Sequence, residues 1–111
     1  MKISTLENIE HFTLLQNSYT DKTIQTGYTS DLLSDVMAHA AEDAVLITIQ
    51  AHKNTIAVAS LVGIPALIIC NNFPPTSDML DAAKKEGIAV FQTPENQFKT
   101  SHFIAQLLKS E

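Results

Sequence analysis

Arginine is absent from this sequence of 111 residues, and all seven basic side chains are lysines. Twelve acidic residues outnumber them, which leaves a formal net charge of −5 at pH 7. Duplex nucleic acid is held mainly by a basic surface, and arginine is the usual reader of guanine. Phosphoryl transfer commonly relies on an arginine clamp. The composition therefore excludes nucleic acid as a partner and weighs against a phosphoryl-transfer enzyme.

Cysteine and glycine are also scarce. Cys70 is the single cysteine, so the chain can form neither an intrachain disulfide nor a cysteine-based zinc site. It lies in the apolar run 66–70, and we expect a buried small hydrophobe rather than a reactive thiol. With only three glycines, the sequence contains neither a P-loop nor a dinucleotide-binding fingerprint. We expect no cofactor and no bound metal.

Long hydrophobic runs are missing as well. The N-terminal segment MKISTLENIEHF lacks the apolar core of a signal peptide. No segment approaches the roughly 18 consecutive apolar residues of a membrane helix. We therefore expect a cytoplasmic protein with no membrane contact. The length favours one domain that covers residues 1–111.

The sequence does contain a regular alternation of apolar strands and helices. The runs AVLITI and ALIIC are nearly continuous in apolar residues, which is typical of strands covered on both faces. Strands of this kind alternating with helices predict a mostly parallel sheet in a three-layer α/β/α sandwich. The predicted helices are 5–12, 30–40, 54–62, 76–86 and 96–109, and the predicted strands are 12–15, 23–28, 44–49, 66–70 and 88–91.

Local signals refine this outline. Ser4 and Glu7 fit a capping box at the first helix, and Gly87 fits the left-handed residue that ends a helix. The two short early strands are expected to pair with each other at one edge of the sheet. Phe98 and Phe103 are expected to belong to the core face of the last helix.

Polar residues follow several of the predicted strands at the points where helices begin. Ser30 and Asp31 follow the second strand, and His52 and Asn54 follow the third. The carboxyl ends of parallel strands meet at one edge, where the first N–H groups of helices favour anions. We therefore expect these four side chains to be neighbours and to form a pocket for a small anionic ligand.

His52, Asp31 and the nearby Asp35 allow alternative interpretations. His52 has three interpretations. It is a loop residue that caps the next helix together with Asn54, or it contacts a ligand, or it acts as a general base. Asp31 and Asp35 are four residues apart, so on one helix they share a face. With His52 they would supply a metal site or the acid and base of a small hydrolase. Alternatively, Asp31 complements the helix dipole and Asp35 bonds backbone or faces solvent.

Two sequence blocks also resemble a known family. GYTSDLLSDVM at 27–37 and ITIQAHKNTIAVASLVGIPALII at 47–69 resemble the DRTGG domain family, and the resemblance extends from about Thr26 to Phe98. The namesake motif is matched only in part, because its arginine and second glycine are missing. Its matching residues are Asp21, Lys22, Thr26 and Gly27.

The resemblance implies an α/β/α sandwich similar to the N-terminal domain of HPr kinase/phosphorylase. Such domains are non-catalytic parts of that kinase, of some phosphotransacetylases and of pyrophosphatases with CBS domains, and they are associated with oligomerisation and regulation. Stand-alone members also occur, some of them beside iron-hydrogenase genes. The family supplies no catalytic residue. The positions that match its shared surface, and that we expect to bind a ligand, are Tyr28, Ser30, Asp31, Asp35, Thr48, His52 and Asn54.

The leading hypothesis is a non-catalytic regulatory module that forms a homodimer and binds a small anionic or nucleotide ligand at the strand ends. The alternative is a protein-interaction subunit of a redox (iron-hydrogenase-associated) or metabolic enzyme complex. A third hypothesis is a small hydrolase that uses His52 with Asp31 or Asp35.

Overall fold

The computed structural model describes residues 1–111 and contains one sheet of five strands, in the order β1-β5-β4-β3-β2. Strands β2 to β5 run parallel, and β1 is antiparallel to β5. The prediction of a mostly parallel sheet is confirmed. The elements in chain order are η1 (Ile3–Asn8), β1 (Thr13–Gln16), β2 (Thr26–Thr29), α1 (Leu33–His39), β3 (Ala44–Thr48), α2 (Lys53–Val62), β4 (Ala66–Ile69), α3 (Ser77–Glu86), β5 (Ala89–Gln92) and α4 (Gln97–Lys109).

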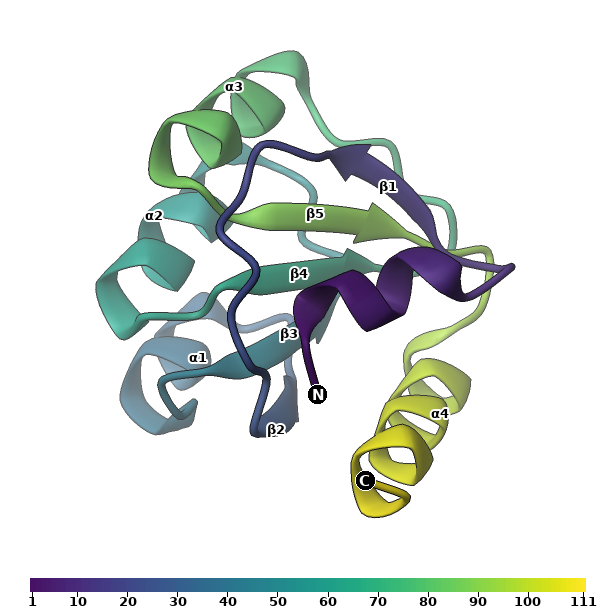
Figure 1. Ribbon diagram of the computed structural model, residues 1–111. Coiled ribbons are helices and arrows are strands. Elements are labelled where there is room, and N and C mark those ends of the chain that lie inside the picture. Colours follow the sequence, from purple (N-terminus) through teal and green to yellow (C-terminus); the bar gives the residue numbers. More distant parts are fainter.

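Helices cover both faces of this sheet, as predicted for a three-layer sandwich. Helices α1, α2 and α3 lie on one face, and η1 and α4 lie on the other (Figure 1). Every residue of β3 and β4 is buried, because each strand contributes side chains to both layers. One apolar core lies beneath η1 and α4 and includes Phe91 and Ile104, and the other lies beneath α1 to α3 and includes Leu67 and Met79.

Several helix ends follow from local sequence. The Thr76 hydroxyl caps α3 by accepting from the Met79 N–H (3.3 Å), and the Asn96 side chain caps α4 by accepting from the Lys99 N–H (2.9 Å). Gly87 ends α3 with φ +71°, which confirms its predicted role. No helix is long and apolar enough to serve as a membrane span.

The prediction that the two early strands pair with each other is wrong. β1 and β2 lie at opposite edges of the sheet. The segment that joins them crosses the end of the sheet (Figure 1) and is held there by buried Ile24, whose N–H bonds the Met1 carbonyl (2.6 Å). At the opposite edge, β1 is held beside β5 by the Gln16 side chain, which donates to the Ile88 carbonyl (2.7 Å). These long-range contacts separate the two strands.

The first predicted helix is shorter and tighter than expected. Residues Ile3–Asn8 form a 3₁₀ helix with no side-chain cap, so the capping box is wrong. The backbone N–H and the hydroxyl of Ser4 both donate to the Asp21 carboxylate (2.9 and 2.5 Å), and Glu7 accepts from the Tyr19 hydroxyl. Both expected capping partners are therefore used by the segment that joins β1 to β2.

The predicted core position of Phe98 is also wrong. Its side chain is 82% exposed, whereas Phe103 packs against Phe12 with ring centroids 5.8 Å apart. Thr100 and Ile104 are the buried residues of α4. Since each residue turns a helix by about 100°, Phe98 points about 200° away from Thr100.

Candidate functional site

Asp31 lies at the centre of a hydrogen-bonded group at the carboxyl end of the sheet. Its Oδ1 accepts from the Thr48 hydroxyl (3.0 Å) and from the Ile49 N–H (2.9 Å), and its Oδ2 accepts from the Gln97 amide (2.9 Å). The carboxylate thereby joins the loop after β2 to the end of β3 and to the first turn of α4. We call the side chains of Asp31, Thr48, Gln50, His52 and Gln97 the Asp31 network.

Gln50 connects His52 to this network. The Gln50 amide donates to the backbone carbonyl of Asp31 (2.8 Å), and its Oε1 lies 2.7 Å from His52 Nε2. The backbone carbonyl of Gln50 accepts from the Thr55 hydroxyl in the first turn of α2 (3.0 Å). His52 is therefore joined to Asp31 through an amide, and no hydrogen bond links it to a carboxylate.

The surroundings of Asp31 change its acidity in two opposite directions. Partial burial raises its pKa, whereas the hydrogen bonds from Ile49, Gln97 and Thr48 lower it. The hydrogen bonds prevail, and the pKa of Asp31 lies below its ordinary value. Asp31 is therefore ionised at neutral pH and is the only carboxylate of the network.

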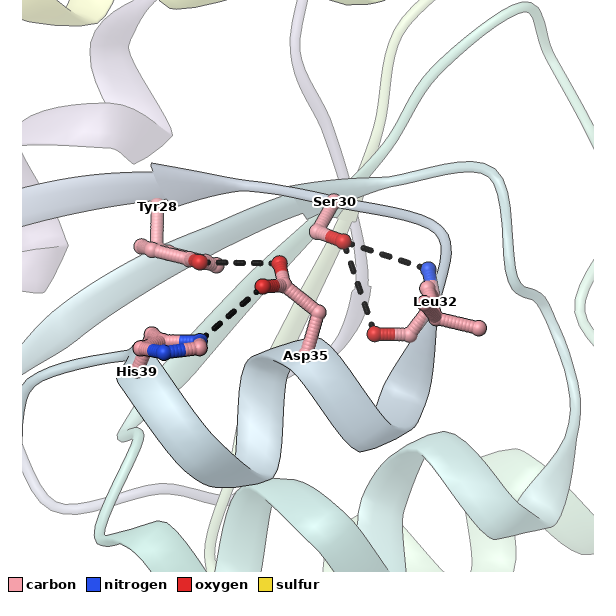
Figure 2. Close-up of polar contacts among 5 residues, drawn as sticks. All are labelled: Tyr28, Ser30, Leu32, Asp35 and His39. Carbon is pink, nitrogen blue, oxygen red and sulfur yellow. Dashed lines mark hydrogen bonds and ion pairs between the residues drawn. The ribbon is translucent and has the colours of Figure 1, made fainter.

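Asp35 lies in a second group, which Figure 2 shows. Its carboxylate accepts from the Tyr28 hydroxyl (2.8 Å) and lies 3.1 Å from His39 Nδ1. The hydrogen bond from Tyr28 is the main cause that lowers the pKa of Asp35, and the same bond raises the pKa of Tyr28. We call Tyr28, Asp35 and His39 the Asp35 cluster. It lies between β2, which contributes Tyr28, and α1, which contributes the other two residues (Figure 2).

The two aspartates therefore do not share a helix face, and that prediction is wrong. Helix α1 begins at Leu33, so Asp31 precedes it. The Ser30 hydroxyl accepts from the Leu32 N–H (3.2 Å), and this local turn delays the helix (Figure 2). Leu32 is the N-cap residue, and no side chain caps α1.

The seven expected site residues are thus divided. Thr48, Asp31 and His52 come together in the Asp31 network, and Tyr28 meets Asp35 in the other group. Asn54 is exposed at the second position of α2 and does not cap that helix. No three His, Cys, Asp or Glu side chains gather as metal ligands, so the alternative of a metal held by Asp31, Asp35 and His52 has no geometry to support it.

Sequence reasoning omitted Gln50, Gln97 and His39 from the site. Gln50 directly follows a predicted strand, so the rule that selected His52 also applied to it. Gln97 follows the capping residue Asn96 but lies 66 residues from Asp31 in sequence, and no local pattern pairs the two. His39 follows Asp35 by four residues, and that spacing on one helix was the available signal.

The expected pocket at this edge is not formed in the structure. Five surface grooves are present, and none is lined by a residue of the Asp31 network or the Asp35 cluster. The largest, of about 540 Å³, runs between α2 and α3 from Lys53 and Asp78 to Ser60 and Glu86. A second, of about 400 Å³, lies between β2 and α4. The polar side chains at the strand ends fill the space between them with their own hydrogen bonds.

The lowered pKa of Asp31 predicts a loss of stability in acid. An unfolded aspartate titrates near pH 3.9, and the folded pKa lies below that value. The stabilisation is therefore complete above about pH 4 and is lost as the pH falls through the folded pKa. We expect the urea midpoint to be constant from pH 7 to 5 and to fall below about pH 4. Asp31→Asn should flatten this fall, whereas Asp81→Asn, at an exposed carboxylate of α3, should leave it unchanged.

The comparisons with known proteins agree with this architecture. Residues 41–110 match the family described as HPr Serine kinase N terminus. No curated protein matches the sequence. Among solved structures, the fold is similar to the CBS and DRTGG domains of the regulatory region of Clostridium perfringens pyrophosphatase, a structure complexed with the activator diadenosine tetraphosphate. The TM-score is 0.66 at 17% sequence identity.

That similarity covers 86% of this chain and 42% of the pyrophosphatase chain, so this protein spans less than half of the compared structure. At such low identity the similarity describes the fold. The family match covers most of the chain, from just before β3 to the end of α4. The expected resemblance is confirmed, and the chain belongs to the family of DRTGG-like domains that form the N terminus of HPr serine kinase.

Proposed function

We propose that this protein is a non-catalytic regulatory module that forms a homodimer and binds a nucleotide at the carboxyl end of its sheet. The observation that carries the proposal is the Asp31 network. It joins the loop after β2, the start of α2 and the start of α4 in one set of hydrogen bonds. A ligand that displaces one of these segments must therefore shift the other two, which is the property a regulatory domain needs.

A catalytic role receives less support from the same geometry. His52 is held by an amide, and Asp31 is enclosed by three donors, so neither group has a free partner for proton transfer. Asp35 is bonded to Tyr28 and His39 instead of His52. A small hydrolase built on His52 would need to break this network before it could act.

Two observations suggest a nucleotide: the ligand of the similar pyrophosphatase region, and the residues at the strand ends of this chain. The similar pyrophosphatase region was solved with diadenosine tetraphosphate, which combines phosphates with adenine bases. In this chain, α2 begins at Lys53 with no side-chain cap, so its first N–H groups and a lysine can meet a phosphate. Gln50 and Gln97 supply amides that can pair with a base or a sugar hydroxyl once their hydrogen bonds to Asp31 open.

Thermal denaturation and calorimetry with AMP, ATP, diadenosine tetraphosphate and pyrophosphate test the ligand. We expect at least one nucleotide to raise the midpoint, since a ligand at 100 times its Kd adds about 2.7 kcal/mol to the free energy of unfolding. Lys53→Gln should weaken binding about fivefold or more, whereas Lys84→Gln at the end of α3 should not. No shift with any compound at millimolar concentration would remove the nucleotide from the proposal.

A further inference from the structure

Phe98 is the most exposed aromatic side chain of this protein. It is 82% exposed on the first turn of α4, although the sequence predicted a core position. A single apolar side chain at a surface needs no explanation by itself, but Phe98 also lines a groove of about 430 Å³. The groove lies between α4 and His11, which belongs to the turn between η1 and β1. Pockets for small molecules begin at about 300 Å³, so this groove has room for a ligand.

Two other rings of the groove are held in place by the core. The His11 ring lies edge-on to Phe12 and to Phe103, with centroids 4.7 and 4.8 Å apart. Phe12 is buried, and Phe103 packs against the same apolar core. The imidazole and the Phe103 ring are therefore already ordered before a ligand arrives. Binding to such a surface loses less conformational freedom than binding to mobile side chains.

The residues that α4 contributes to the groove share one face of the helix. Phe98 and His102 are four residues apart, as are Lys99 and Phe103, and side chains at this spacing are neighbours on a helix. The buried Thr100 and Ile104 belong to a different face. Aromatic rings attract one another in offset-stacked or edge-to-face pairs. Two phenylalanine rings and an imidazole along one groove therefore favour a planar aromatic ligand over an aliphatic one.

The polar groups of the groove suit a ligand with negative charge. Lys99 has an ammonium group with three donors, and His11 and His102 each have an N–H in either neutral tautomer. Although the chain has a net charge of −5, Glu95 is the only carboxylate that lines the groove. Its Oε2 lies 3.8 Å from Lys99 Nζ, and both side chains are partly exposed. Ion pairs of this kind are weak, so Lys99 is available to an anionic group.

We propose that this groove binds a small planar aromatic molecule that carries one anionic group. The ring of the ligand lies beside Phe98 and contacts Phe103 and His11, and Lys99 and His102 bind its anionic group. None of the residues that line the groove belongs to the Asp31 network or is Lys53. The site is therefore separate from the one proposed above for a nucleotide.

Nuclear magnetic resonance titration of the full chain with 2-naphthoate at pH 7 tests the site. We expect saturable chemical-shift changes in the amide and ring resonances of His11, Phe98 and His102. Binding should be weaker for 2-naphthol, which lacks the charge, and for cyclohexanecarboxylate, which lacks the aromatic ring. Equal binding of the three compounds would overturn the stated ligand chemistry. No saturable change with 2-naphthoate at millimolar concentration would overturn the site.

Four variants with effects of different sign locate the ligand. Phe98→Ala should raise the Kd for 2-naphthoate about fivefold or more, because one stacking surface is lost. Lys99→Gln should raise it severalfold, whereas Glu95→Gln removes the only carboxylate of the groove and should lower it severalfold. Lys53→Gln, at the start of α2, should leave it unaltered. Binding that is lost in Lys53→Gln and kept in Phe98→Ala would assign the ligand to the strand ends and overturn the groove.

Discussion

Replacing Asp31 by alanine is expected to lower the free energy of unfolding by about 2–4 kcal/mol, because three donors lose one acceptor together. Thr48 is fully buried, and its hydroxyl would be left without its partner, as would the Ile49 N–H and the Gln97 amide. Hydrogen bonds to a charged group are stronger than neutral ones, and an unpaired buried donor adds its own desolvation cost. For a domain of this size we expect the thermal midpoint to fall by roughly 10 °C or more.

Two variants separate this effect from a general loss of charge. Asp81→Ala removes an exposed carboxylate of α3 and should change the free energy of unfolding by less than about 0.5 kcal/mol. Gln97→Ala removes only the donor from α4 and should cost less than Asp31→Ala. Urea denaturation at pH 7 measures all three. If Asp31→Ala proves as mild as Asp81→Ala, the network does not hold the strand ends together.

Phe91→Ala is expected to have the largest effect of any substitution considered, about 3–5 kcal/mol. Phe91 is fully buried in the central part of β5, and its ring lies 6.4 Å from that of Phe12. Alanine would leave a cavity between β5 and the layer of η1 and α4. Because β5 is paired with β1 and β4, the surrounding structure can collapse into that cavity only in part. Urea or thermal denaturation monitored by circular dichroism measures the loss.

Phe98→Ala provides the matched control, since it deletes the same atoms at a side chain that is 82% exposed. We expect it to change the free energy of unfolding by less than about 0.5 kcal/mol. Comparable losses at Phe91 and Phe98 would mean that α4 is rotated relative to its position in the structure. The pair therefore tests the orientation of α4 as well as the packing of β5.

The order of the central elements was predictable because their signals are local. The runs that form β3 and β4 are continuous in apolar residues, and each is followed by a helix whose end is marked by glycine, at Gly63 and Gly87. Both glycines have positive φ, which other residues rarely adopt. The N-terminal third was harder, because the 3₁₀ helix and the segment before β2 are held by contacts with distant residues.

The candidate site was predictable in part. The rule that polar residues at the ends of parallel strands converge identified Asp31 and His52, which the structure joins through Gln50. It did not reveal Gln97, whose place beside Asp31 depends on how α4 crosses the sheet. The spacing of Asp31 and Asp35 indicated one helix face, but the turn at Ser30 starts α1 two residues after Asp31.

The sequence by itself determined the α/β layering, the parallel centre of the sheet and the absence of an arginine-based nucleic-acid surface, since residue type and short-range periodicity govern these properties. Only the tertiary structure decided that β1 and β2 occupy opposite edges and that Asp31 faces Gln97 while Asp35 faces Tyr28. Those outcomes depend on contacts between residues far apart in the chain. Their free energies arise only when the complete sheet is assembled, so no local pattern of residues encodes them.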